Sequence, residues 1–122
     1  MPRILIADDR ESMPTAIRLV LRTHPDWEVC GEAADGQEAI TKAEELSPDL
    51  IVLDFRMPLA NGLKASSEIC GSKPNVPIVM HTLYKTPELE VAAKLVGIRQ
   101  VIGKEDGAKH LEVAIENELS RQ

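Results

Sequence analysis

The sequence predicts an α/β fold in which a parallel β-sheet is covered by helices on both faces. Short apolar runs that are rich in β-branched residues alternate with longer segments of helical period. Because strands and helices alternate along the chain, we expect parallel strands joined by right-handed crossovers. The runs predicted as strands are Arg3–Ala7, Glu28–Ala33, Leu50–Leu53, Ile78–Met80 and Val101–Ile102.

Apolar side chains at helical spacing predict amphipathic helices between these strands. Three sets follow the spacing of a single helical face. These sets are Ile17, Val20 and Leu21; Ala39, Ile40, Ala43 and Leu46; and Leu111, Ala114, Ile115 and Leu119.

Residues typical of helix ends stand at the borders of these segments. Asp35, with a glutamate three residues later, predicts an N-cap, and so does Thr86 followed by a proline. Gly97 and Gly71 are expected to end helices in the left-handed conformation.

Composition limits the function of the chain. The 122 residues are 43% hydrophobic and 28% charged, which predicts one globular domain spanning residues 1–122. A net charge of −6 and 2% aromatic residues argue against nucleic-acid binding, which needs a basic face or aromatic stacking platforms. The start lacks a leader and no apolar run is long enough to span a bilayer, so we expect no membrane contact and a cytoplasmic location. Cys30 and Cys70 lack metal-site spacing and are expected to be small core residues.

Polar residues follow the predicted strands at the edge where such a sheet binds its ligands. Ligands of open α/β sheets lie outside the carboxyl ends of the strands. Asp8 and Asp9 follow the first strand, Asp54 follows the third, Thr82 the fourth and Lys104 the fifth. The second strand is followed by an alanine, as expected for an outer strand that does not reach the site.

These residue types suit phosphoryl transfer. Three carboxylates at one edge repel each other and call for a hard cation, and Mg²⁺ prefers carboxylates, water and phosphoryl oxygens. Asp9 and Asp54 are the expected direct ligands. A carboxylate oxygen of Asp54 can attack phosphorus to give an acyl phosphate. The metal and the Lys104 ammonium would offset charge on the phosphoryl oxygens, and the Thr82 hydroxyl would donate to one of them.

Four segments, taken in order, resemble the successive signatures of response-regulator receiver domains. They are ILIADD (4–9), LIVLDFRMPLANG (50–62), PIVMHTLYK (77–85) and VIGKEDG (101–107). Each is weak alone, but together they cover nearly the whole chain. The resemblance implies a flavodoxin-like, doubly wound sheet of five strands in the order 2-1-3-4-5.

The same resemblance implies a site and a function. Asp54 would be the phosphoacceptor of a two-component signalling switch, phosphorylated from the phosphohistidine of a sensor histidine kinase or phosphotransfer protein, with Mg²⁺ bound and Asp8 in the outer shell of the metal. Such a receiver catalyses its own phosphorylation and slow dephosphorylation but is no turnover enzyme. The residues implied to bind metal or phosphoryl group are Asp8, Asp9, Asp54, the backbone carbonyl of Arg56, Thr82 and Lys104.

The segment after Lys104 narrows the resemblance. Its Glu-Asp-Gly sequence, without a proline after the lysine, resembles receivers that precede a LuxR-type helix-turn-helix output domain, which implies transcription regulation. No such domain is present in these 122 residues. We therefore expect an output domain in a longer chain or a separate partner.

Two positions depart from the family pattern. Val101 stands where receivers commonly carry a tyrosine or phenylalanine that turns inward on phosphorylation, and Tyr84 is the nearest aromatic that can substitute. Asn61 stands where an acidic residue is frequent and is expected to cap the third helix. We expect the signal to leave through backbone movement after Thr82 toward a face that includes Glu88, Val91, Arg99 and Val101. A homodimer would use this face, formed by the fourth helix, fifth strand and fifth helix, or else the first helix.

Two other functions compete with this one. A phosphohydrolase of the haloacid-dehalogenase kind also uses an aspartate nucleophile, magnesium and a lysine, but it carries Asp-x-Asp on its first strand rather than adjacent aspartates. A receiver-like interaction module that no longer takes phosphate is the other alternative. His81 is expected to be a packed or surface side chain rather than a second phosphoryl site, and His24 and His110 are expected only at the polar surface. The sequence names neither the kinase nor the signal nor the output.

Overall fold

The computed structural model describes residues 1–8 and 15–121, whose strands form one parallel sheet in the order β2-β1-β3-β4-β5. This is the flavodoxin-like order that the resemblance implied. The strands are β1 (Arg3–Ala7), β2 (Glu28–Ala33), β3 (Leu50–Leu53), β4 (Ile78–Thr82) and β5 (Gln100–Gly103). The last two are longer than predicted because the ladder continues through the pairs His81–Ile102 and Thr82–Gly103. Thr82 is therefore the final residue of a strand.

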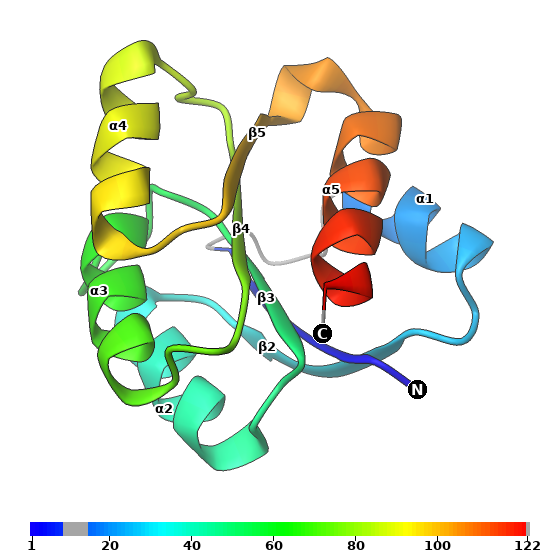
Figure 1. The fold of residues 1–122 in the computed structure, drawn as a ribbon, viewed down its shortest axis with the longest axis horizontal. Coiled ribbons are helices and arrows are strands. Elements are labelled where there is room, and N and C mark those ends of the chain that lie inside the picture. Colours follow the sequence, from blue (N-terminus) through cyan, green and yellow to red (C-terminus); the bar gives the residue numbers. More distant parts are fainter. Residues whose placement is uncertain (9–14, 122) are drawn as a thin grey trace.

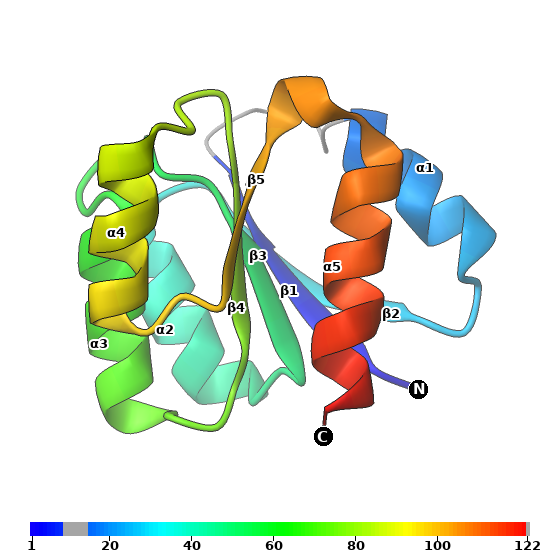
Figure 2. The same cartoon turned by 45° about the horizontal axis from the view of Figure 1, so that its top comes forward.

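Helices cover both faces of the sheet, as the alternation of elements predicts. Helices α1 and α5 lie on one face, and α2, α3 and α4 lie on the other (Figures 1 and 2). The bounds are α1 (Thr15–Thr23), α2 (Gly36–Leu46), α3 (Gly62–Ser72), α4 (Pro87–Val96), the short 3₁₀ helix η1 (Lys104–Asp106) and α5 (Ala108–Ser120).

Alternating side chains of the strands build two apolar cores, one on each face. Leu5 and Leu53 point into the core under α2, α3 and α4, whereas Ile4 and Val52 point into the core under α1 and α5. Each of these side chains is almost fully buried, which stabilises the fold by about 1.5–3 kcal/mol per side chain. The three predicted helical faces of α1, α2 and α5 all pack into these cores.

Four predicted helix ends are confirmed. The Asp35 side chain accepts a hydrogen bond from the amide of Glu38 at 2.7 Å, and the Thr86 hydroxyl accepts one from the amide of Leu89 at 3.1 Å. Asn61 caps α3, because its side-chain oxygen accepts a hydrogen bond from the backbone amide three residues later. Gly97 ends α4 with φ of 102°, a left-handed conformation that favours glycine.

The helix end predicted at Gly71 is wrong. Helix α3 continues through Gly71 to Ser72, and its end is satisfied when the Lys73 amide donates to the Ile69 carbonyl at 2.6 Å. Lys73 has a φ of −132°, so this end needs no left-handed residue. Gly71 is an exposed helical residue with nothing within 4 Å of the place where a Cβ would stand.

The cysteines are small apolar packing residues, as predicted. Cys30 and Cys70 are free, half-buried and packed against the core under α2, α3 and α4. Burial raises the pKa of both thiols, so neither has the thiolate character of a reactive cysteine. Within the described ranges, no helix has the length and apolar content needed to cross a bilayer.

Gly62 allows α3 to begin directly against the end of β3. A Cβ built on Gly62 would lie 2.3 Å from the Asp54 carbonyl oxygen and 2.9 Å from the Cα of Phe55. The Gly62 amide also donates to the Phe55 carbonyl at 2.7 Å, so the backbone cannot move away without breaking that bond. The absence of a side chain at this position therefore sets how closely α3 approaches the residues that follow β3.

We predict opposite effects of alanine at the two glycines of α3. Gly62→Ala should lower the free energy of unfolding by about 1–3 kcal/mol, because the new methyl group meets backbone atoms. Gly71→Ala should raise it by about 0.5 kcal/mol through helix propensity alone. Urea denaturation of both variants measures the difference. Equal stability of the two would show that the contact beside Asp54 is not tight.

Candidate functional site

Two buried carboxylates lie side by side at the carboxyl ends of the central strands. Asp8 follows β1 and Asp54 follows β3, and the Asp54 amide donates to the Ala7 carbonyl at 2.9 Å, which holds the two aspartates level. The Asp8 amide donates in turn to the Ala33 carbonyl of β2 at 2.9 Å. Asp8 is 8% exposed and Asp54 is 7% exposed. Two carboxylates so poorly solvated require a positive charge beside them.

Lys104 supplies that charge. Its Nζ donates to Oδ2 of Asp8 at 2.8 Å and to Oδ2 of Asp54 at 2.9 Å. The lysine side chain is only 7% exposed, so one buried ammonium bridges two buried carboxylates. Lys104 comes directly after β5, two strands away from Asp54, and its long side chain crosses the end of β4 to reach them.

Local backbone contacts fix the Asp54 carboxylate and the start of the lysine segment. The Phe55 amide donates to Oδ1 of Asp54 at 2.7 Å, so each oxygen of this carboxylate has a donor. After Lys104 the chain turns in η1, where Oδ2 of Asp106 accepts from the Gly103 amide at 3.2 Å. This turn places Lys104 where the last strand ends.

Thr82 lies at the same edge, at the end of the strand between β3 and β5. It is fully buried, and its hydroxyl oxygen accepts a hydrogen bond from the Tyr84 amide at 3.1 Å. The contact ties the threonine hydroxyl to the loop that precedes α4. His81, the residue before it, is 2% exposed, which confirms that it is a packed side chain.

Arg56 and Tyr84 connect the two loops that flank the site, a contact that sequence analysis missed. The Arg56 guanidinium carbon lies 4.4 Å from the centroid of the Tyr84 ring, a cation–π distance. Both side chains are exposed, and Arg56 lies two residues after Asp54. No spacing rule connects residues 28 positions apart, so only the fold could bring them together.

The structure thus brings together Asp8, Asp54 and Lys104 by direct contacts and places Thr82 on the intervening strand. Asp9, the other predicted metal ligand, lies outside the described residues. The donor chemistry fits a hard divalent cation, because Asp8 and Asp54 present carboxylate oxygens that are buried and close enough to share a single ammonium. A site of this kind can bind a cation and an anionic phosphoryl group at the same edge.

Known proteins resemble this chain in sequence and in fold. The family model of the response regulator receiver domain matches residues 4–116. The response regulator protein VraR of Staphylococcus aureus is 35% identical over 113 residues, which make up 93% of this chain and 54% of VraR. A crystal structure of a LuxR-family two-component response regulator from Aurantimonas sp. SI85-9A1 has a TM-score of 0.91 at 27% identity, covering 98% of this chain and 86% of that one.

Relatives differ in what else they carry. A protein-glutamate methylesterase/protein-glutamine glutaminase 1 of Methanosarcina acetivorans is 42% identical over 84 residues, which are 69% of this chain but 24% of that protein. The chain therefore spans about half the length of VraR and about a quarter of the methylesterase. Similarity ends at the shared domain, so it does not carry the activity of either whole protein.

We predict that Lys104→Met destabilises the protein when no divalent metal is present. The two carboxylates would lose their shared ammonium while staying buried, which should cost about 3–5 kcal/mol of unfolding free energy. The control is Lys85→Met, because Lys85 lies 3.9 Å from Asp106 with both side chains about one-third exposed. That exposed pair should contribute no more than about 1 kcal/mol. Thermal melts in metal-free buffer that place both variants at the same midpoint would contradict this role for Lys104.

Proposed function

This chain belongs to the family of response regulator receiver domains of two-component systems, and from that premise we propose that Asp54 accepts a phosphoryl group from the phosphohistidine of a sensor histidine kinase or phosphotransfer protein. The observation that carries the proposal is the buried Lys104 ammonium between Asp8 and Asp54. We further propose that residues 1–122 act as one receiver domain located in the cytoplasm.

Asp54 is the nucleophile in this proposal. One of its carboxylate oxygens attacks the phosphorus, and the bond between phosphorus and the imidazole nitrogen of the donor breaks. The electron pair of that bond stays on the nitrogen, and because the other ring nitrogen of the phosphohistidine carries a proton, the donor leaves as a neutral histidine while Asp54 becomes an acyl phosphate. Asp54 suits this step because backbone and Lys104 contacts hold its carboxylate in one orientation.

Lys104 and Thr82 act on the phosphoryl oxygens. The Lys104 ammonium already lies 2.9 Å from the acceptor carboxylate, and it offsets negative charge on an oxygen of the incoming group. The Thr82 oxygen uses a lone pair to accept from the Tyr84 amide, which leaves the hydroxyl hydrogen to donate to a phosphoryl oxygen. We propose that Thr82 shifts toward the phosphoryl group for this donation and that the loop bonded to it shifts as well.

Mg²⁺ would be held by Asp9 and Asp54, with Asp8 in the outer shell and the Arg56 carbonyl as a further ligand. When bound, the cation neutralises charge that accumulates on the carboxylates and the phosphoryl oxygens. The chain then catalyses its own phosphorylation and slow dephosphorylation by positioning and electrostatics, without turning over a separate substrate.

We propose that the signal leaves through the loop from Thr82 to Tyr84 toward α4, β5 and α5. Tyr84 connects to Thr82 through its amide and to Arg56 through its ring, so movement at the phosphoryl site reaches both loops. Val101 is half-buried against the core and has no ring to swing inward. Val91 and Leu95 on α4 are 62% and 82% exposed, which provides apolar area for a partner or a second copy. The α1 surface is the alternative face for a homodimer.

The output of the switch is proposed from the relatives. LuxR-family regulators are among the similar structures, and VraR extends well beyond the matched segment. We propose that this receiver controls transcription through an output domain in a longer chain or through a partner. The net charge of −6 argues against DNA binding by these residues themselves.

We predict that the protein takes up one phosphoryl group from acetyl phosphate only when Mg²⁺ is present, and that Asp54→Asn abolishes the uptake. An amide cannot form the acyl phosphate, and without the cation the carboxylates repel the incoming anion. Intact-mass spectrometry and phosphate-affinity gels measure the label, and Asp26→Asn, at an exposed turn, is the matched control. Labelling of the Asp54→Asn variant at the wild-type level would show that another residue accepts the phosphoryl group. Steady turnover of an added phosphate ester would instead indicate a phosphohydrolase.

We predict that beryllofluoride, a phosphoryl mimic, changes amide chemical shifts from Thr82 through Tyr84 and along α4, β5 and α5. A coupling of about 1–3 kcal/mol is typical of such switches and suffices to shift a partner equilibrium. Thr82→Val, which removes the hydroxyl at nearly constant shape, should keep the shifts next to Asp54 and lose those beyond Tyr84. Shifts confined to the surroundings of Asp54 in the wild type would show that this route carries no signal.

A further inference from the structure

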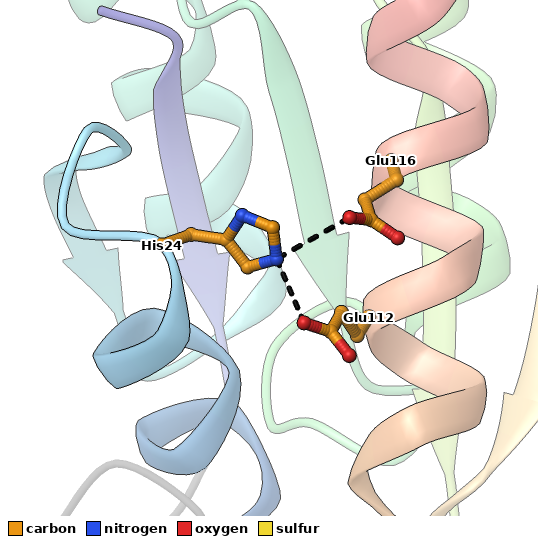
Figure 3. Close-up of side chains that lie close together, drawn as sticks. All are labelled: His24, Glu112 and Glu116. Atoms are coloured by element: carbon orange, nitrogen blue, oxygen red, sulfur yellow. Dashed lines mark hydrogen bonds and ion pairs between the residues drawn. The ribbon is translucent and has the colours of Figure 1, made fainter.

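A second cluster of ligand-type side chains lies where the end of α1 meets α5 (Figure 3). Nε2 of His24 lies 2.7 Å from Oε2 of Glu112 and 3.4 Å from Oε2 of Glu116. The two glutamates stand four residues apart on α5 and therefore share one helical face. Nothing in the position of His24 along the chain indicates this cluster, because Glu112 is 88 residues away.

Neighbouring groups hold the histidine and one of the glutamates in place. The His24 ring stacks on Trp27 with ring centroids 3.8 Å apart and planes 6° from parallel. Oε2 of Glu112 also accepts from the Thr23 hydroxyl at 3.1 Å, and its Oε1 lies 3.2 Å from the Lys109 ammonium. The imidazole edge and the Glu112 carboxylate are thus oriented toward each other before any ligand arrives.

We propose that His24, Glu112 and Glu116 form a site for a borderline transition-metal ion, with Zn²⁺ as the expected occupant. Among the described residues, these three offer one nitrogen and two carboxylate oxygens whose ligand atoms all lie within 4.8 Å of one another. Zn²⁺ takes such ligands at about 2.0–2.2 Å in a tetrahedron, which sets neighbouring ligand atoms about 3.3 Å apart. The separation from Nε2 to Glu116 already has this value, and the one to Glu112 would open by about 0.6 Å.

The ligand set selects against the cation proposed for the Asp54 site. Imidazole nitrogen suits Zn²⁺, Co²⁺ and Ni²⁺, whereas Mg²⁺ prefers six oxygens. Two carboxylates balance the charge of a divalent ion. An open hollow of about 330 Å³ borders His24, Trp27 and Glu116, so a water molecule has access to the fourth coordination position.

These contacts could also be explained as ion pairs that hold α1 against α5. Ion pairing alone, however, would need fewer carboxylates than this cluster contains. One carboxylate suffices to pair with one imidazole, and the Nε2 edge here faces two. The second carboxylate, on Glu116, has a 44% exposed side chain and lies 3.4 Å from Nε2, which makes a poor hydrogen bond but suits two ligand atoms of one metal ion. A bound ion would connect the end of α1 to the middle of α5 and stabilise the folded state.

The test is titration of the protein with ZnCl₂ in excess Mg²⁺, in an Asp54→Asn background that weakens cation binding at the other site. We expect one Zn²⁺ bound with a dissociation constant below about 10 μM and a rise in the melting midpoint of roughly 5 °C at saturation. Glu116→Gln should weaken binding at least tenfold, and His24→Gln should abolish it. His110→Gln, at an exposed histidine of the same helix, is the matched control and should bind as the parent does.

Spectroscopy keeps the test independent of how the variants fold. Zn²⁺ should shift the imidazole resonances of His24 and leave those of His81 and His110 in place, and Co²⁺ should give the visible absorption of a four-coordinate site. A dissociation constant above about 100 μM, unmoved His24 resonances, or equal Zn²⁺ binding by the parent and by Glu116→Gln would each overturn the proposal.

Discussion

The constraint on which the site depends is the shared positive charge of Lys104. Asp8 and Asp54 are each less than one-tenth exposed, and two ionised carboxylates in that setting stay buried only with a cation beside them. The ammonium reaches both from the end of β5, so it links the first, third and fifth strands at one edge of the sheet. A group that adds charge at Asp54 therefore acts on the Lys104 ion pairs, which connect the strand ends on both sides of the site.

Backbone contacts position the residues that carry the two carboxylates. Parallel pairing of β1 with β3 sets Asp8 and Asp54 level, and the start of α3 at Gly62 presses against the Asp54 carbonyl. The hydrogen bond from the Tyr84 amide to Thr82, together with the cation–π contact of Arg56 with the Tyr84 ring, connects the loop after β3 with the loop after β4.

The two faces of the sheet carry different chemistry. Helices α2, α3 and α4 cover an apolar core, whereas the meeting of α1 with α5 also brings a histidine next to two glutamates. The acidic site and this second cluster differ in donor type, since one offers only oxygen atoms and the other includes an imidazole nitrogen. Because of this difference in ligand type, Mg²⁺ would prefer the acidic site and Zn²⁺ would prefer the cluster that contains the histidine.

The sequence by itself determined the strands, most helix ends and the edge where the site lies, because these depend on local periodicity and on capping residues a few positions apart. It predicted that Asp54, Thr82 and Lys104 lie at strand ends, but not how their side chains contact one another. Only the tertiary structure decided that Lys104 bridges two aspartates, that Arg56 stacks on Tyr84, and that His24 faces α5. These contacts join residues 28 to 96 positions apart, and no short-range pattern encodes them. Gly71 shows that a local pattern can also mislead. Glycine is typical of helix ends, but Gly71 lies inside α3, and the end of that helix is stabilised by the backbone amide of a later residue.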